Sequence, residues 1–226
     1  ELFALYRQEP VRATHTLLAD EDWATSWQQY FKPFAIVPGL VIKPSWEPYT
    51  PAPGERVIEM DPGMAFGTGQ HASTRLALEL ICARLERSPC VRALDVGTGT
   101  GILAMAAAQF GCARVVAVDN DPDAVTVARQ NVAHNRLAER IDLGSTPVAE
   151  IGGLFQLVAA NIVHDVLVDM APELTRLSAP GASLVLAGIL SGEQEAHLVQ
   201  VYTALGCRIL DRRYRDEWVA LELLRA

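Results

Sequence analysis

The run from Ala93 to Leu103 constrains the fold of this chain more than any other segment. Its apolar first half leads into the loop Gly97-Thr98-Gly99-Thr100-Gly101, and an alanine-rich helical pattern follows. A strand, a glycine-rich loop and a helix, in that order, are how a doubly wound α/β sheet holds a nucleotide-like cofactor. Glycine is needed because the chain turns tightly and the ligand must approach the backbone closely. We therefore predict an α/β, Rossmann-like fold in which Gly97 and Gly99 bind a cofactor.

The spacing of these glycines separates the possible cofactors. The dinucleotide fingerprint G-x-G-x-x-G requires a glycine at position 102, where this chain has Ile102, so a nicotinamide-dependent oxidoreductase is disfavoured. The observed G-x-G-x-G resembles motif I of the class I methyltransferases, which use S-adenosylmethionine. Taken alone, the loop is also compatible with an ordinary strand-to-helix turn.

Asp119 is the next candidate ligand of the cofactor. It follows a predicted strand at 114–118 and lies 22 residues after Gly97, close to the spacing of about 20 that is typical of a ribose-binding acid. A carboxylate at this position can accept hydrogen bonds from both ribose hydroxyls. Alternatively, Asp119 belongs to a helix-capping cluster with Asp121 and Pro122, and both interpretations hold if Asp121 caps while Asp119 binds.

Asn161 follows another apolar strand, at 155–160. Ligands of open α/β sheets lie beyond the carboxyl ends of the strands, so Asn161 is expected beside Gly97 and Asp119. An amide oxygen can accept a hydrogen bond from an amine and orient its lone pair, and positioning of this kind supplies much of the catalysis of methyl transfer. We predict a catalytic role for Asn161. The alternative is that Asn161, or equally Asp165, only caps the following helix.

A second glycine-rich segment runs from Asp61 to Thr74, ahead of a predicted helix at 74–85. Its backbone N–H groups, hydroxyls and single aromatic ring suit a loop that folds over a ligand, although a flexible connector is the simpler alternative. His71 could act as a base, but a lone histidine is more often a hydrogen-bonding structural residue.

The order of the remaining elements predicts one catalytic domain. Alternating strands and helices followed by two terminal strands indicate a seven-stranded, mostly parallel sheet with an antiparallel end and helices on both faces. We assign residues 1–60 to a linker and N-terminal extension packed on the catalytic domain, and residues 61–226 to the cofactor-binding domain. Strands are expected at 40–42, 56–60, 91–96, 114–118, 140–143, 155–160, 183–189, 208–210 and 218–223, and helices at 22–31, 74–85, 101–110, 122–134, 165–178 and 191–204.

Composition narrows the possible partners and location. The net charge of −8 argues against nonspecific nucleic-acid binding, which requires clustered Lys and Arg. The four cysteines show no C-x-x-C pair and no metal-ligand spacing, so free thiols in a reducing cytoplasm are expected. The sequence shows neither a signal peptide nor an apolar run long enough to span a bilayer. No metal requirement is predicted.

Several elements in the right order resemble the bacterial ribosomal protein L11 methyltransferase family. The loop Asp61-Pro62-Gly63-Met64-Ala65-Phe66-Gly67-Thr68-Gly69-Gln70-His71 is similar to the family's D-P-G-x-A-F-G-T-G-x-H, which is a highly specific motif. The resemblance covers nearly the whole chain. Four further segments share it: Asp22–Pro33 with W-x-x-x-W-x-x-x-F-x-P, Pro44–Trp46 with P-S-W, Ala160–Ile162 with A-N-I/L, and Gly188–Leu190 with G-I-L.

The resemblance implies a reaction and a set of site residues. S-adenosylmethionine would donate methyl groups to lysine or N-terminal amines of ribosomal protein L11, leaving S-adenosylhomocysteine. The protein is expected to be a monomer. The implied cofactor-binding residues are Thr74, Gly97, Asp119 and Asn161, with Phe66, Gly67, Thr68 and His71 in a loop that covers the cofactor.

Three departures from the family pattern keep the substrate open. Ala72-Ser73 stands where proline and threonine are usual, and Thr98 stands where cysteine is common. The family has a separate N-terminal recognition domain, of which only the trailing linker is expected here. A methyltransferase for another protein or a small amine, and a non-catalytic module that binds S-adenosylmethionine, therefore remain as alternatives.

Overall fold

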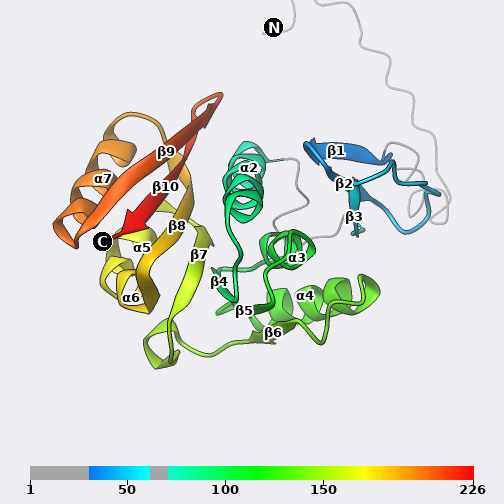
Figure 1. Cartoon of the computed structure of the whole chain (residues 1–226), viewed down its shortest axis with the longest axis horizontal. Helices are drawn as coiled ribbons and strands as arrows, with labels where there is room; N and C mark the ends of the chain where they lie inside the picture. Colours follow the sequence, from blue (N-terminus) through cyan, green and yellow to red (C-terminus); the bar gives the residue numbers. More distant parts are fainter. Residues whose placement is uncertain (1–30, 62–70) are drawn as a thin grey trace, which may run out of the picture. The chain divides into compact units, whose positions relative to one another are not determined.

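A computed structural model describes residues 31–61 and 71–226, and the compact unit extends from Pro33 to Ala226 (Figure 1). Among the described residues, no helix combines the length and the apolar character that crossing a membrane requires. The proposed division at residue 60 stays a prediction.

Seven strands form the main sheet: β4 (Arg92–Val96), β5 (Arg114–Val118), β6 (Ile141–Gly144), β7 (Phe155–Asn161), β8 (Ser178–Leu190), β9 (Cys207–Arg215) and β10 (Trp218–Arg225). Their order is β6-β5-β4-β7-β8-β10-β9. The first five are parallel, whereas β10 is antiparallel to β8 and to β9. The predicted mostly parallel sheet with an antiparallel end is confirmed. The chain runs outward from β4 through β6 and then returns to β7 on the other side of β4, which makes a topological switch point between β4 and β7.

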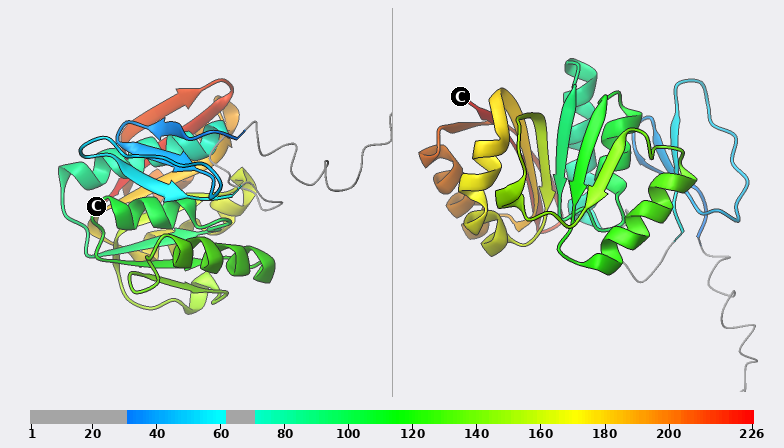
Figure 2. Two further views of the ribbon diagram at one scale, coloured as in Figure 1. Left: turned by 90° about the vertical axis from the view of Figure 1, so that its right-hand side faces the viewer. Right: turned by 90° about the horizontal axis from the view of Figure 1, so that it is seen from below.

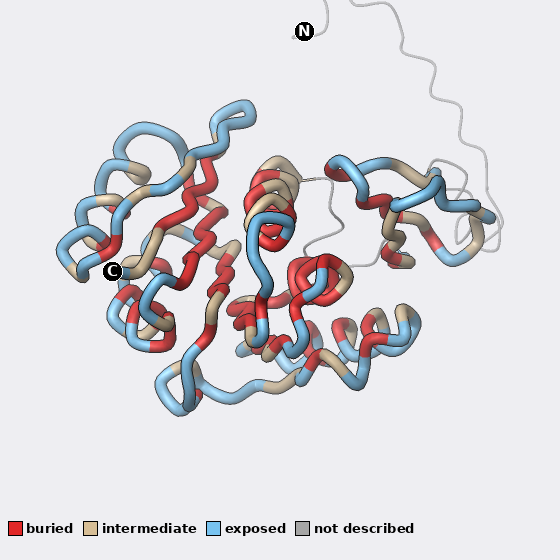
Figure 3. The backbone as a smooth tube through the Cα atoms, viewed as in Figure 1, coloured by how far each residue is buried: buried red, intermediate tan, exposed pale blue. Residues whose placement is uncertain are grey.

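Helices cover both faces of this sheet (Figure 2). The first cluster of buried side chains joins α2 (Ala72–Arg87), α3 (Ile102–Gln109) and Val132 of α4 (Pro122–His134) to one face. The second joins α5 (His164–Asp169), α6 (Ala171–Leu177) and α7 (Glu193–Ala204) to the other face. Neighbouring strand residues such as Ala93 and Leu94 belong to opposite clusters, because successive side chains alternate across a sheet. The central strands β4 and β7 are therefore buried on both sides, whereas most residues of the edge strand β9 are exposed (Figure 3).

The single helix predicted at 165–178 is wrong. The chain forms α5 and α6 instead, which meet at Met170, and α6 carries Pro172 in its first turn. Proline lacks the N–H donor that a continuous helix would need there, and it fits the first turn of a new helix. Strand β8 begins at Ser178, five residues earlier than predicted, through a register shift opposite Phe155 and Leu157.

A smaller sheet lies against α3 in the same unit. It contains β1 (Phe34–Val37), antiparallel to β2 (Leu40–Lys43), which is parallel to β3 (Arg56–Glu59). The Arg56 Nε donates to the Gln109 carbonyl at 3.0 Å, and the Glu59 backbone N–H donates to Asn135 Oδ1 at 2.8 Å. The sequence predicted β2 and β3 but not β1, and the helix predicted at 22–31 lies outside the described residues except for Phe31.

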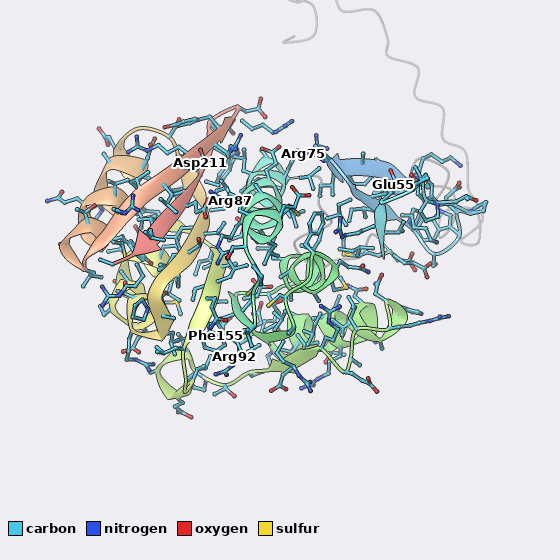
Figure 4. The ribbon with its side chains drawn as sticks, in the orientation of Figure 1. Glu55, Arg75, Arg87, Arg92, Phe155 and Asp211 are labelled. Atoms are coloured by element: carbon cyan, nitrogen blue, oxygen red, sulfur yellow. The ribbon has the colours of Figure 1, made fainter. Side chains whose placement is uncertain are left out.

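Two arginines brace the sheet (Figure 4). The guanidinium of Arg92, at the start of β4, lies 4.6 Å from the ring centre of Phe155, at the start of β7. At the end of α2, Arg87 Nη2 lies 2.8 and 2.6 Å from the two carboxylate oxygens of Glu222, whose side chain is 0% exposed. The Ser183 hydroxyl donates a further hydrogen bond to this carboxylate at 2.8 Å.

Candidate active site

The loop after β4 takes a shape that requires glycine. Gly97, Gly99 and Gly101 have φ angles of 71°, 54° and 83°, in the left-handed region that other residues rarely adopt. A Cβ atom on Gly97 would lie 2.4 Å from Cγ2 of Ile162, in the segment that follows β7. The absence of a side chain at Gly97 therefore lets the loops after β4 and β7 meet at the switch point.

Asp119 holds this loop from the end of β5. Its Oδ2 accepts a hydrogen bond from the Gly99 backbone N–H at 2.8 Å, and its Oδ1 accepts one from the Asp121 N–H at 3.0 Å. Asp121 is the N-cap of α4 and accepts from the Asp123 N–H at 2.9 Å, with Pro122 in the first turn. The predicted capping role of Asp121 is confirmed. Asp119 does not cap α4 but bonds to the loop after β4.

Asn161 is the last residue of β7, and only one end of its side-chain amide is hydrogen-bonded within the described residues. Its Nδ2 donates to the Thr74 hydroxyl at 3.2 Å, whereas its Oδ1 is buried and has no hydrogen-bond partner among the described residues. The N-cap of α5 is Val163, with no side-chain capping bond, so neither Asn161 nor Asp165 caps this helix. A buried polar atom without a partner needs an explanation.

Gly188 in β8 lets the end of β7 come this close. Its φ is +85°, and a Cβ atom there would lie 2.6 Å from the Ile162 carbonyl oxygen and 3.1 Å from Asn161 Oδ1. The sequence singled out Gly188 only as part of a family motif. Its close packing against Asn161 depends on the contact between β7 and β8, which the sequence does not show.

A cavity of about 790 Å³ opens at the switch point, within the range typical of small-molecule sites. A smaller cavity of about 340 Å³ adjoins it and shares Gly97, Asp119 and Ile162 with it. The structure thus brings four predicted site residues together around one space. The larger cavity is lined by Gly97, Gly99, Asp119, Asn120, Asp121, Asp123, Ala124, Val127, Asn161, Ile162, Val163 and Val166.

The other predicted site residues lie at or before the start of α2. Thr74 is buried and reaches the cavity only through Asn161. His71 is the N-cap of α2, accepting from the Ser73 N–H at 3.3 Å, and its ring meets that of Trp218 edge-on at 4.7 Å between centres. His71 thus makes the hydrogen bond of a helix cap, and its predicted place in a loop that covers the cofactor stays a prediction. Phe66, Gly67 and Thr68 lie outside the described residues.

Asp95 is a buried acid beneath the loop that the sequence reading passed over. Its Oδ2 accepts from the Thr98 hydroxyl at 2.7 Å and from the Ala104 N–H at 3.1 Å, while its Oδ1 has no partner among the described residues. Burial is the main cause that raises its pKa to about 6, against the lowering effect of these two hydrogen bonds. The signal in the sequence was an acidic residue within the otherwise apolar run 93–96.

The switch point, the glycine-rich loop and the polar residues that end β5 and β7 define a class I methyltransferase with a Rossmann-like fold. The model of one family, ribosomal protein L11 methyltransferase (PrmA), matches residues 4–226. The chain belongs to this family and is an S-adenosylmethionine-dependent methyltransferase, which confirms the resemblance and the enzyme class predicted from the sequence.

Known relatives are similar to this protein in sequence or structure along most of the chain. It is 50% identical over 212 residues to the ribosomal protein L11 methyltransferase of Geobacter metallireducens, covering 94% of this chain and 69% of that protein. It is 43% identical over 223 residues to the protein of that name from Desulfotalea psychrophila, covering 99% and 74%. The crystal structure of the ribosomal protein L11 methylase from Lactobacillus delbrueckii subsp. bulgaricus superimposes with a TM-score of 0.79 at 32% identity, covering 86% of this chain and 99% of that one.

Proposed function

We propose that this enzyme methylates lysine side-chain amines, and an N-terminal amine, of ribosomal protein L11. The relatives from Geobacter metallireducens and Desulfotalea psychrophila are named for that substrate. The observation that carries the proposal is Oδ1 of Asn161 at the switch point, which is buried and has no hydrogen-bond partner in the described part of the chain. It is a hydrogen-bond acceptor without a donor, and an amine is a donor.

The described residues fit S-adenosylmethionine, which supplies a methyl group bound to a positively charged sulfur. In this proposal, the Gly97 and Gly99 backbone allows the close approach and the Asp119 carboxylate accepts hydrogen bonds from the ribose. Asp121 and Asp123 also line the cavity and add negative charge that favours a cationic ligand. We further assign Phe66, Gly67, Thr68 and His71 to the loop that covers the cofactor, on the strength of the family motif.

Asn161 orients the acceptor. The hydrogen bond between its Nδ2 and the Thr74 hydroxyl fixes the plane of the amide and so fixes the direction in which Oδ1 accepts. A neutral amine that donates to Oδ1 keeps its lone pair free and directed into the cavity. Holding the nucleophile in this way contributes much of the rate enhancement, because methyl transfer requires alignment more than proton transfer within the transition state. Thr74 acts as a positioning residue through Asn161.

The proposal also covers the setting of the reaction. We place the enzyme in the cytoplasm as a monomer that acts on a protein substrate without binding nucleic acid itself. Residues 61–226 would carry the chemistry, and residues 1–60 would form the extension that leads into it.

The test is transfer of radiolabelled methyl groups from S-adenosylmethionine to purified ribosomal protein L11. Asn161→Ala should lower kcat by about 100-fold or more, while the Kd for S-adenosylmethionine, measured by calorimetry, changes by about tenfold at most. Asn120→Ala is the matched control, because Asn120 lines the same cavity but has no assigned part in the reaction, and it should keep nearly full activity.

The outcomes separate the parts of the proposal. Cofactor binding without label on ribosomal protein L11 would refute that substrate and direct the search to other amines. Equal activity of Asn161→Ala and the parent would refute the role of the amide.

A further inference from the structure

Two of the four cysteines meet at the end of the sheet opposite the cavity. Cys90 precedes β4 by two residues and Cys112 precedes β5 by two residues. Because Arg92 pairs with Arg114 in these neighbouring parallel strands, the two cysteines also lie side by side. Their Sγ atoms lie 3.1 Å apart, and both side chains are buried. The Ala113 N–H donates to the Cys90 carbonyl at 3.0 Å and fixes this juxtaposition.

The spacing suits a covalent bond between the two sulfurs. Neighbouring strands lie about 4.8 Å apart, which falls within the Cα separation of roughly 4.4–6.8 Å that a disulfide accepts. The sulfurs must approach by about 1 Å to reach the bonded length of roughly 2.05 Å. A rotation of the two side chains achieves this without moving either strand far.

The surroundings of Cys112 lower the pKa of its thiol. The hydrogen bond with Cys90 is the largest cause that holds the pKa of Cys112 below its ordinary value, and the charge of Arg140 adds to it, against the opposing effect of burial. In the other two cysteines, burial outweighs the interactions that lower the pKa. Burial raises the pKa of Cys82 to about 12, and burial also raises the pKa of Cys207.

Cys112 also lies just below the protein surface. Both of its chain neighbours, Gly111 and Ala113, are exposed. Ala113 lines an open surface recess with Arg114, Glu139 and Arg140. This recess beside Ala113 is the route by which a small oxidant would approach the buried sulfur of Cys112.

We propose that Cys90 and Cys112 form a redox-active dithiol that a peroxide converts to a disulfide. The Cys112 thiolate attacks one peroxide oxygen, the O–O bond breaks, and the departing hydroxide takes up a proton to become water. The Cys90 sulfur then attacks the resulting sulfenic acid, the S–S bond forms, and the hydroxyl group leaves with the Cys90 proton as a second water. The two thiols lose two electrons and two protons, and the peroxide is reduced to two waters.

The experiment treats the full chain with increasing hydrogen peroxide, alkylates the remaining thiols under denaturing conditions and maps the tryptic peptides by mass spectrometry. Arg92 lies between the two cysteines, so trypsin places them on the separate peptides 88–92 and 93–114. The expected product is these two peptides joined, lighter by two hydrogens than their sum and separated again by dithiothreitol. Cys82 and Cys207 should remain fully alkylated.

Single variants test the order of the steps. In Cys90→Ser, Cys112 should accumulate as a sulfenic acid that dimedone traps, whereas in Cys112→Ser no adduct should form on Cys90. Cys82→Ser is the matched control and should form the disulfide as the parent does. The proposal is overturned if the parent yields both cysteines as free thiols at peroxide doses that oxidise its methionines, or if Cys82 and Cys207 oxidise equally fast. The parent's peptide map decides this even if a serine variant fails to fold.

Discussion

Gly188 allows a quantitative test of how the strands shape the site. A Cβ atom there would lie 2.6 Å from the Ile162 carbonyl oxygen, whereas ordinary van der Waals contact begins at 3.4 Å. The substitution Gly188→Ala must therefore move backbone by about 0.8 Å, the difference between these two distances. The atoms that must move are those directly after Asn161. We expect the variant to lose both stability and activity.

The loss of stability has two sources. An alanine held at a left-handed φ costs about 1–2 kcal/mol relative to glycine, and overpacking a dense interior adds about 1–3 kcal/mol. The free energy of unfolding should thus fall by about 2–5 kcal/mol. A displacement of about 1 Å at a catalytic group can lower the rate by about 100-fold, and we expect kcat to fall by a factor of that order.

Gly181→Ala separates the two sources. Gly181 lies in the same strand, β8, with a φ of +76°, but no described atom lies within 4 Å of the Cβ position. The free energy of unfolding of this variant should fall only by the cost of the left-handed φ, and its kcat should not change. Urea denaturation gives the free energies, and methyl transfer at saturating S-adenosylmethionine gives kcat. If Gly188→Ala is as stable and as active as Gly181→Ala, the close approach of β8 to Ile162 contributes nothing to stability or catalysis, and the reasoning is refuted.

Three further predictions concern charge and pH. Burial raises the folded-state pKa of Asp95 from 3.8 to about 6, so the protonated group stabilises the fold below pH 4. About 3 kcal/mol of the free energy of unfolding is lost as the pH rises through 6. Urea denaturation across this range should show a smaller decline in that free energy for Asp95→Asn than for the parent. Arg87→Met should lower the free energy of unfolding by about 3 kcal/mol, because it leaves the buried Glu222 carboxylate without its cation. Glu222→Gln should cost less, because the Arg87 cation that it leaves behind is half-exposed to water. Denaturation midpoints measure both losses, and the reverse ranking would contradict this assignment. The rate of methyl transfer should rise with pH from 7 toward the lysine pKa of about 10.4, and a flat profile with chemistry rate-limiting would exclude a neutral amine as the nucleophile.

Local patterns predicted the parts of the site that are local in the chain. The loop after β4 and Asp119 after β5 could be read directly, because each depends on a short strand followed by a few residues of distinctive type. The capping role of Asp121 was predictable for the same reason. The break between α5 and α6 was also encoded locally, at Pro172, but the surrounding apolar pattern favoured one continuous helix.

Contacts between distant segments could not be predicted. Thr74 and Asn161 are 87 residues apart in the chain, and their hydrogen bond exists only because α2 covers the end of β7. The close approach of Gly188 to Ile162 likewise depends on the pairing of β7 with β8. The short strand β1 was missed because Pro33 and Pro38 flank its four residues and mask the extended pattern.

The hydrogen bond between Thr74 and Asn161 has a consequence for how the protein is made. A site that joins residues so far apart cannot assemble from a fragment that lacks either of them, and it becomes complete only after the central parallel strands have paired, which is a slow, non-local event. Ligand binding to such a site adds to the stability of the complete fold alone. Newly made chains would therefore gain affinity for S-adenosylmethionine last, and its cellular concentration would help to decide how many of them stay folded.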